Sequence, residues 1–172
     1  MLKASQAIVI DENFGPKSIE AKADMPALNS TNMLSSTRQF IRLDSCYGYS
    51  NTLTSESQTA SNLCFIVRVA PNVEVAWETI FVDRRLFVEI PGSILPEGSK
   101  ESLVTLLEYA EEVLECSHVI LVFKKARNDR ANLIRTFMFL GFQVVVPGDP
   151  IVPKASDVMF LAYAIDNYDS DD

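Results

Sequence analysis

The segment that decides the fold runs from Phe87 to Phe142 and contains FVEIPGSILPEGSK (87–100), LLEYAEE (106–112) and RANLIRTFMFLGF (130–142). Its apolar residues alternate between short continuous runs of strand length and stretches at helical spacing. Strands that alternate with helices favour parallel pairing through βαβ units. We therefore predict an α/β domain with a mixed, largely parallel sheet and flanking helices.

The first predicted helix covers residues 99–115. Ser99 is its expected N-cap, and Glu101 lies in the first turn, where the helix dipole favours an anion. Its apolar stripe consists of Leu103, Leu106, Leu107, Ala110, Val113 and Leu114. Its acidic side consists of Glu101, Glu108, Glu112 and Glu115, with Glu111 toward the edge. We expect the leucines to be buried and the carboxylates to face water.

The second predicted helix covers residues 128–139. It is expected to bury some combination of Ala131, Ile134, Phe137 and Met138. Gly141 supplies the left-handed stop that ends many helices.

Apolar and β-branched runs predict the strands, at 63–70, 86–90, 118–123, 142–146 and 158–163. Residues 73–82 (VEVAWETIFV) fit either a strand or a short helix, because their apolar residues satisfy neither period. We expect a mixed sheet with helices on both sides. The order of elements resembles the acetyltransferase-like fold, which by itself does not fix function.

The chain divides into three parts by composition. Residues 1–60 are rich in Ser and Thr without apolar periodicity, which predicts a flexible segment or, alternatively, a long excursion packed loosely on the core. Residues 61–166 form the predicted domain, and residues 167–172 an acidic tail. Order is expected to begin near Leu63.

Charge and cysteine usage limit the partners and the compartment. The formal net charge of −8 argues against binding to nucleic-acid phosphates or anionic membranes and favours a basic protein face. Cys46, Cys64 and Cys116 form no CxxC pair, and no apolar run approaches the length of a membrane span. A soluble, intracellular protein in a reducing compartment is the expected class.

Candidate catalytic groups are sparse. A Cys/His nucleophile pair would combine Cys116 with His118, the single histidine, but a partly buried histidine beside a core-edge cysteine is the favoured interpretation. An acetyl-CoA-dependent acetyltransferase needs a glycine-rich loop at a helix start, whereas residues 91–98 carry two prolines and bring Glu97 toward the phosphates. One histidine and three dispersed cysteines do not form a zinc site. We therefore expect no catalytic residue, no metal and no cofactor.

The acidic side of the first helix is the strongest binding signal. Its glutamates have no Lys or Arg four residues later, so they repel one another by about a few tenths of a kcal/mol per close pair. A basic partner would convert this repulsion to attraction. Lys100 at the helix start, with Lys124 and Lys125 after the next strand, is expected to place positive charge near the acidic residues. A non-catalytic acidic adaptor for a basic protein is the interpretation that the residues alone support.

Several phrases in fixed order resemble the ornithine decarboxylase antizyme family. They are EIPGSILPEGSK (89–100), LLEYAEE (106–112), DRA (129–131), RTFMFLGF (135–142), PGDP (147–150) and VP (152–153). The resemblance covers residues 63–165, and no phrase in the N-terminal segment aligns with the family.

The resemblance implies a protein inhibitor rather than an enzyme. Members of the family bind the ornithine decarboxylase monomer and block its homodimerisation, which removes activity because the active sites form at the dimer interface. The captured enzyme is then degraded by the proteasome without ubiquitin. Members also restrain polyamine uptake, are countered by antizyme inhibitor, and are made by polyamine-stimulated ribosomal frameshifting. A cytoplasmic location, with the nucleus as a second compartment, is implied.

The resemblance also implies which residues contact the decarboxylase. Carried over position by position, they are Lys100, Glu108, Glu111, Glu112 and Lys125. The charge pattern of the first helix points to the same surface without naming the partner.

Overall fold

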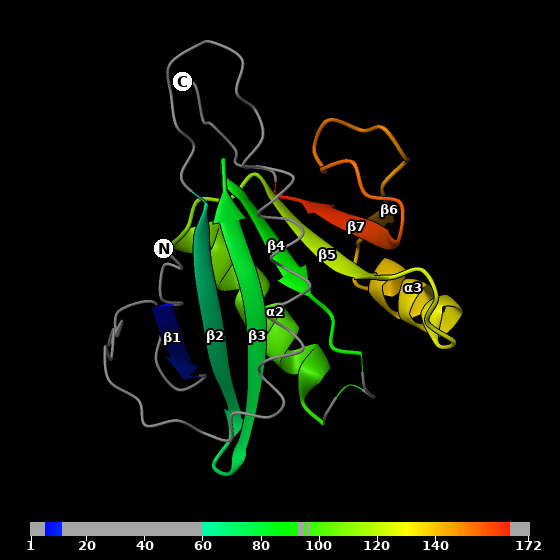
Figure 1. Cartoon of the computed structure of the whole chain (residues 1–172). Coiled ribbons are helices and arrows are strands. Elements are labelled where there is room, and N and C mark those ends of the chain that lie inside the picture. The colour runs from blue at the N-terminus through cyan, green and yellow to red at the C-terminus, as the bar shows by residue number, and fades with distance from the viewer. Residues whose placement is uncertain (1–5, 12–59, 93–94, 96, 166–172) are drawn as a thin grey trace.

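The computed structural model describes residues 6–11, 60–92, 95 and 97–165. These residues form a seven-stranded sheet in the order β1-β2-β3-β4-β5-β7-β6, together with two helices (Figure 1). The elements are β1 (Gln6–Asp11), β2 (Ser61–Ala70), β3 (Val73–Val82), β4 (Arg85–Glu89), α2 (Ser99–Glu112), β5 (His118–Lys124), α3 (Arg130–Phe139), β6 (Gln143–Val144) and β7 (Val158–Ala164). The predicted mixed α/β class is confirmed.

Strand pairing is less parallel than predicted. β1 pairs with β2, and β4 with β5, in parallel, whereas all other neighbouring strands are antiparallel. The strand expected at 142–146 is β6, of which only Gln143 and Val144 pair. β7 lies between β5 and β6 and runs antiparallel to both. The connection from β5 through α3 therefore leads to β6, which is not a neighbour of β5.

Residues 73–82 form a strand, which resolves the ambiguity of the sequence. Val75 and Trp77 point into one core, and Ile80 and Val82 point into the core on the other face. A strand that changes its buried side along its length breaks the two-residue period. This explains why neither a strand nor a helix pattern was clear.

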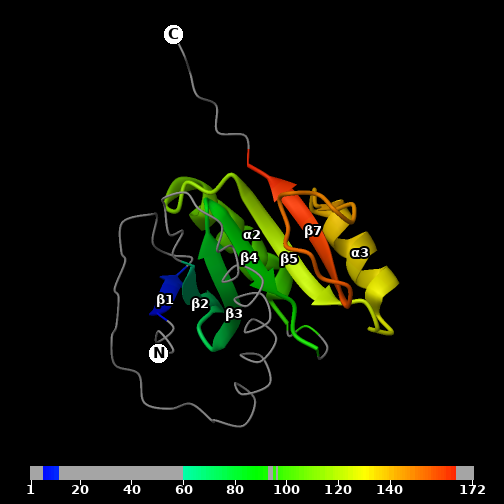
Figure 2. The same ribbon diagram turned by 45° about the horizontal axis from the view of Figure 1, so that its top comes forward.

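Both helices cover the same face of the sheet (Figure 2). Leu103 and Leu106 of α2 and Phe137 of α3 pack into one cluster of buried side chains, which we call the first core. The second core, on the other face, contains Phe87 and Ile120, and the segment between β6 and β7 packs against it. The prediction of helices on both sides is therefore wrong for the described residues, because α3 returns to the face that α2 covers.

The bounds of α2 differ from the prediction at both ends. Gly98, with φ of 81°, occupies the N-cap position, and Ser99 is the first helical residue, not the cap. The helix ends at Glu112, three residues earlier than predicted, and Glu115 has a left-handed φ of 50°. Glu115 therefore does not extend the acidic side of the helix.

A buried hydrogen-bond chain docks α2 on the sheet. Trp77 Nε1 donates to Ser102 Oγ at 3.0 Å, and Ser102 Oγ donates to the carbonyl oxygen of Ser99 at 3.0 Å. Because Trp77 Nε1 and Ser102 Oγ both have partners, Ser102 can lie on the buried side of the helix at little cost. Glu101 lies in the first turn, as predicted.

α3 begins at Arg130 rather than residue 128, and Gly141 follows it with φ of 97° as the predicted left-handed stop. Leu133 and Phe137 are its buried residues. Of the residues expected to be buried, Phe137 is confirmed and Ile134 is half-buried, but Ala131 and Met138 are exposed. The helix therefore has apolar residues on its outward side as well as its inward side.

The N-terminal prediction missed one strand. Gln6–Asp11 forms β1, which pairs in parallel with β2 from Gln6 opposite Leu63 to Asp11 opposite Arg68. Order therefore does not begin near Leu63 as expected. The rest of residues 1–59 and the acidic tail at 167–172 lie outside the described residues.

Gly98 permits a close approach between the start of α2 and the β2–β3 hairpin. A Cβ atom at this position would lie 2.6 Å from Val69 Cγ2, and its φ is left-handed. We expect Gly98→Ala to lower the free energy of unfolding by about 2 kcal/mol, from backbone strain and displacement of Val69. Gly92→Ala is the matched control, since nothing lies within 4 Å of its Cβ position. Equal urea-unfolding midpoints for the two variants would contradict this account.

Candidate partner-binding site

The outward side of α2 carries four of the five predicted contact residues. Lys100, Glu108, Glu111 and Glu112 are all exposed. Their spacing places them along one side of the helix, with Lys100 about 12 to 18 Å from the glutamates along the axis. The last turn contains no basic residue. The structure thus brings Lys100 and the glutamates onto one surface, which we call the α2 face.

Val104 also belongs to this surface and was not predicted from the sequence. Val104 lies between Lys100 and Glu108 at four-residue spacing, and 39% of its surface is exposed. The sequence could have indicated its exposure, because Val104 lies outside the leucine stripe. An apolar residue between two charged residues on the same side of a helix is not expected to pack into the core. A partner can cover an apolar residue at the centre of a charged surface without removing a polar group from water.

The structure does not bring Lys125 together with the glutamates. Lys125 follows β5, and its N–H donates to the carbonyl oxygen of Asp157 at 2.9 Å. It lines a pocket of about 710 Å³ together with Val158 and Phe160, which belong to the second core. α2 packs on the first core, so the sheet separates Lys125 from the acidic part of the α2 face. The expectation that Lys125 places positive charge near these glutamates is therefore wrong.

Arg127 connects the loop after β4 to the start of α3. Its Nε and Nη2 donate to the two carboxylate oxygens of Asp129, each at 2.8 Å, and its Nη1 donates to the carbonyl oxygen of Pro91. The hydrogen bonds from Arg127 lower the pKa of the Asp129 carboxyl. Asp129 is the residue before the first turn of α3. One buried guanidinium thus ties the chain that leads to Lys100 to the helix that follows β5.

The cysteines of the described chain are not catalytic nucleophiles. Burial raises the pKa of both the Cys64 and the Cys116 thiol to about 12. The thiolate is the reactive form, so these side chains are inert near neutral pH. Cys116 is fully buried in the first core, which rules out the Cys116/His118 nucleophile pair.

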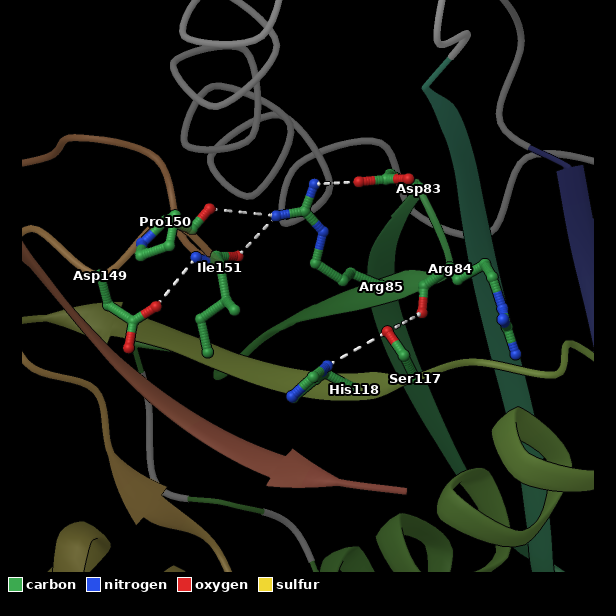
Figure 3. Close-up of polar contacts among 8 residues, drawn as sticks. All are labelled: Asp83, Arg84, Arg85, Ser117, His118, Asp149, Pro150 and Ile151. Atoms are coloured by element: carbon green, nitrogen blue, oxygen red, sulfur yellow. Dashed lines mark hydrogen bonds and ion pairs between the residues drawn. The ribbon is translucent and has the colours of Figure 1, made fainter. Parts of the chain in front are cut away.

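His118 contacts Ser117 instead (Figure 3). His118 Nδ1 lies 3.1 Å from Ser117 Oγ, and Ser117 Oγ donates to the carbonyl oxygen of Arg84 at 3.2 Å. The direction of the hydrogen bond between Ser117 and His118 is set by the imidazole tautomer.

A second group of polar contacts, centred on the Arg85 side chain, reaches the segment between β6 and β7 (Figure 3). Arg85 Nη1 donates to the carbonyl oxygen of Ile151 at 2.9 Å, and Arg85 Nη2 donates to Asp83 Oδ2 at 2.7 Å. The Ile151 N–H in turn donates to Asp149 Oδ1 at 3.0 Å. These bonds hold that segment against the β3–β4 turn, and they are fully explained by this structural role.

Within the described ranges, no three His, Cys, Asp or Glu side chains gather as ligands for one metal ion. No helix in this part of the chain is long and apolar enough to cross a membrane.

Residues 75–165, more than half of the chain, match the family model described as ornithine decarboxylase antizyme. The chain belongs to this family. The resemblance that the sequence phrases indicated is thereby confirmed, and the match includes α2, α3 and all the candidate contact residues.

Relatives from vertebrates and an insect show the same similarity. Ornithine decarboxylase antizyme 1 of Xenopus laevis is 44% identical over 122 residues, which are 69% of this chain and 56% of the relative. Antizyme 2 of Mus musculus is 48% identical over 97 residues, 56% of this chain and 51% of the relative. The antizyme of Aedes aegypti is 40% identical over 116 residues, 63% of this chain and 48% of the relative. The chain spans about half the length of these relatives.

Two solved structures are also similar to the fold. A putative acetyltransferase from Agrobacterium tumefaciens has a TM-score of 0.43 at 12% identity and is matched over 84% of this chain and 99% of that one. An acetyltransferase from Bacillus cereus has a TM-score of 0.43 at 11% identity, over 82% and 98% of the two chains.

Proposed function

We propose that this chain binds the monomer of ornithine decarboxylase through the α2 face and prevents the enzyme from forming its homodimer. The observation that supports the proposal most is the set of exposed glutamates on α2, without a basic residue in its last turn, inside the part of the chain that matches the antizyme family. The chain acts as a protein inhibitor and carries out no reaction of its own.

Electrostatic repulsion within the α2 face supports a basic partner. Glu108 has Glu111 three residues and Glu112 four residues further along, and both spacings place carboxylates side by side. Each such pair costs about a few tenths of a kcal/mol in the free protein. A basic surface relieves this cost on binding and also increases the rate of encounter.

The two lysines extend the proposed contact along one edge of the sheet. Lys100 lies beyond the exit of β4, and Lys125 lies beyond the end of β5. β4 and β5 are parallel, so their carboxyl ends lie at the same edge. A decarboxylase monomer that covers α2 and curves round this edge would reach both lysines.

The proposal includes the consequences for the decarboxylase. An inhibitor that occupies the dimer interface removes activity, because the active sites form between the two subunits. We propose further that the captured enzyme passes to the proteasome without ubiquitin, giving feedback control of polyamine synthesis and uptake. Antizyme inhibitor competes for the same chain in this scheme, which operates in the cytoplasm and the nucleus.

Size-exclusion chromatography with light scattering on a mixture of this chain and ornithine decarboxylase tests the central step. We expect the decarboxylase homodimer to be replaced by a 1:1 heterodimer, and the enzyme activity measured across that peak to be absent. The reason is that one partner cannot occupy the same interface as the second decarboxylase subunit.

The two alternative functions predict different results. A generic acidic adaptor would leave the decarboxylase dimeric and fully active, and that outcome would contradict the proposal. An acetyltransferase would show saturable heat on titration with acetyl-CoA, which the proposal does not expect.

A further inference from the structure

Two large apolar side chains are exposed on the outward side of α3. Phe139 is 88% exposed and Met138 is 55% exposed, although both are large apolar residues. Together with Ala131, Ile134 and Arg135 they follow the i, i+3, i+4, i+7, i+8 spacing of one helix side. We call these five residues the α3 stripe. Exposed apolar patches of this kind mark interaction sites in soluble proteins.

Of the α3 stripe, only Ile134 packs partly against the first core. Leu133 and Phe137, on the inward side of the helix, supply the fully buried contacts. Phe137 also packs edge-on against Phe142, with ring centroids 6.0 Å apart. The helix is therefore already anchored, and Met138 and Phe139 remain available to another molecule.

Two hollows flank the Phe139 side chain. One, of about 590 Å³, is lined by the five residues of the α3 stripe. The other, of about 260 Å³, lies between the start of α2 and α3 and is lined by Lys100, Arg135, Thr136, Phe139 and Leu140. A ridge between two hollows offers a partner places for its own apolar side chains, as in the ridges-into-grooves packing of helices.

The charge beside this ridge is positive, in contrast to the chain as a whole. The net charge is −8, yet no described residue lining either hollow is acidic. Lys100 and Arg135 form no ion pair with any other described residue. Charge complementarity therefore favours a partner that brings carboxylates to this flank.

We propose that the α3 stripe docks an amphipathic helix with an acidic flank. Its apolar residues pack against Met138 and Phe139, and its carboxylates pair with Arg135 and Lys100. The length and spacing of the stripe match two to three turns of such a helix, the usual mode of helix-in-groove recognition. Methionine suits this surface because its flexible side chain adapts to the partner.

This inference goes beyond the proposed function. The glutamates of the α2 face call for a basic partner, whereas the α3 stripe, together with Lys100 at the border of the two surfaces, calls for an acidic one. The two surfaces therefore differ in the sign of charge that they select, and they can be tested with separate probes.

Fluorescence anisotropy with a synthetic helical peptide tests the proposal on the full chain. The probe has leucines at the i, i+3, i+4, i+7 positions and glutamates on both flanks, and a second peptide replaces every glutamate with lysine. We expect saturable binding of the glutamate peptide alone, even though the net charge of the chain repels it. Phe139→Ser should weaken this binding about thirtyfold, because an exposed aromatic anchor is lost. Arg135→Glu should weaken it further and reduce its dependence on salt.

Val104→Ser is the matched control, because it removes an exposed apolar side chain from α2 and leaves the α3 stripe intact. It should bind the glutamate peptide with unchanged affinity. No saturable binding, equal binding of the lysine peptide, or equal affinity of the Phe139→Ser variant would overturn the proposal. Light scattering that shows a dimer of this chain which Phe139→Ser converts to a monomer would assign the stripe to a second copy, and would also overturn it. None of these measurements involves the decarboxylase.

Discussion

Reversing the three glutamate charges of the α2 face, through Glu108→Lys, Glu111→Lys and Glu112→Lys, is expected to weaken decarboxylase binding about a hundredfold or more. The substitutions turn an attractive surface into a repulsive one at positions where charge pairs across protein interfaces contribute more than 1 kcal/mol each (about 1.5–7 kcal/mol in measured cases). All three side chains are exposed, so the thermal midpoint should stay close to that of the unaltered chain. Inhibition of decarboxylase turnover, titrated with each variant, measures the loss.

Two double variants with the same change in net charge test whether the loss of inhibition depends on the position of the substituted glutamates. Glu108→Lys with Glu111→Lys changes the charge by the same amount as Glu74→Lys with Glu97→Lys, which lie in the β2–β3 hairpin and before α2. Glu74 pairs with Arg68 at 2.8 Å, and an exposed pair of this kind contributes little to stability. The first double variant should lose inhibition and the second should keep it. Equal inhibition by both would remove α2 from the interface.

Leu106→Ala is expected to lower the free energy of unfolding by about 3 kcal/mol. Leu106 is fully buried in the first core, where α2 packs on the sheet, and its removal leaves a cavity that neighbouring side chains fill only in part. Urea unfolding, with the midpoint and slope fitted together, measures the loss. Because the α2 face is untouched, the folded fraction of the variant should still bind decarboxylase.

Leu107→Ala is the control for this substitution. Leu107 belongs to the same predicted stripe but is only half-buried, so its removal should cost about 1 kcal/mol. Equal costs for the two leucines would show that the packing side of α2 is rotated from the one described.

The sequence predicts most elements whose burial is uniform. Residues 119–123 are apolar throughout because β5 is central and covered on both faces, and the strand predicted at 118–123 differs from β5 by one residue. β7 is found equally well for the same reason. The two helices are found because their buried residues recur at helical spacing. The insertion of β7 between β5 and β6 is not predicted, since strand pairing depends on contacts between distant segments.

Strand prediction from the sequence is wrong where the same residue types occur both in strands and in other extended segments. Val145 and Val146 look like strand residues, yet β6 ends at Val144, because β-branched side chains suit any extended segment. β1 was missed because its run of apolar residues is short and isolated in a polar segment.

The candidate sites show the same limit. The glutamates of α2 are predictable because charge at helical spacing opposite a leucine stripe faces water. Met138 and Phe139 are not predictable, since apolar residues on a helix normally indicate the core, and only the structure shows which of its two apolar sides is covered.

The position of β7 in the sheet determines when this domain can finish folding during synthesis on the ribosome. β6 forms its ladder with β7, and β7 alone connects it to β5. The β6 edge and the α3 corner beside it therefore cannot be completed while Val158–Ala164 is still being synthesised. Until β7 has been synthesised, α3 and the exposed Phe139 side chain lie beside an incomplete sheet. β7, which is synthesised after all the other strands, then inserts between β5 and β6 and completes the sheet.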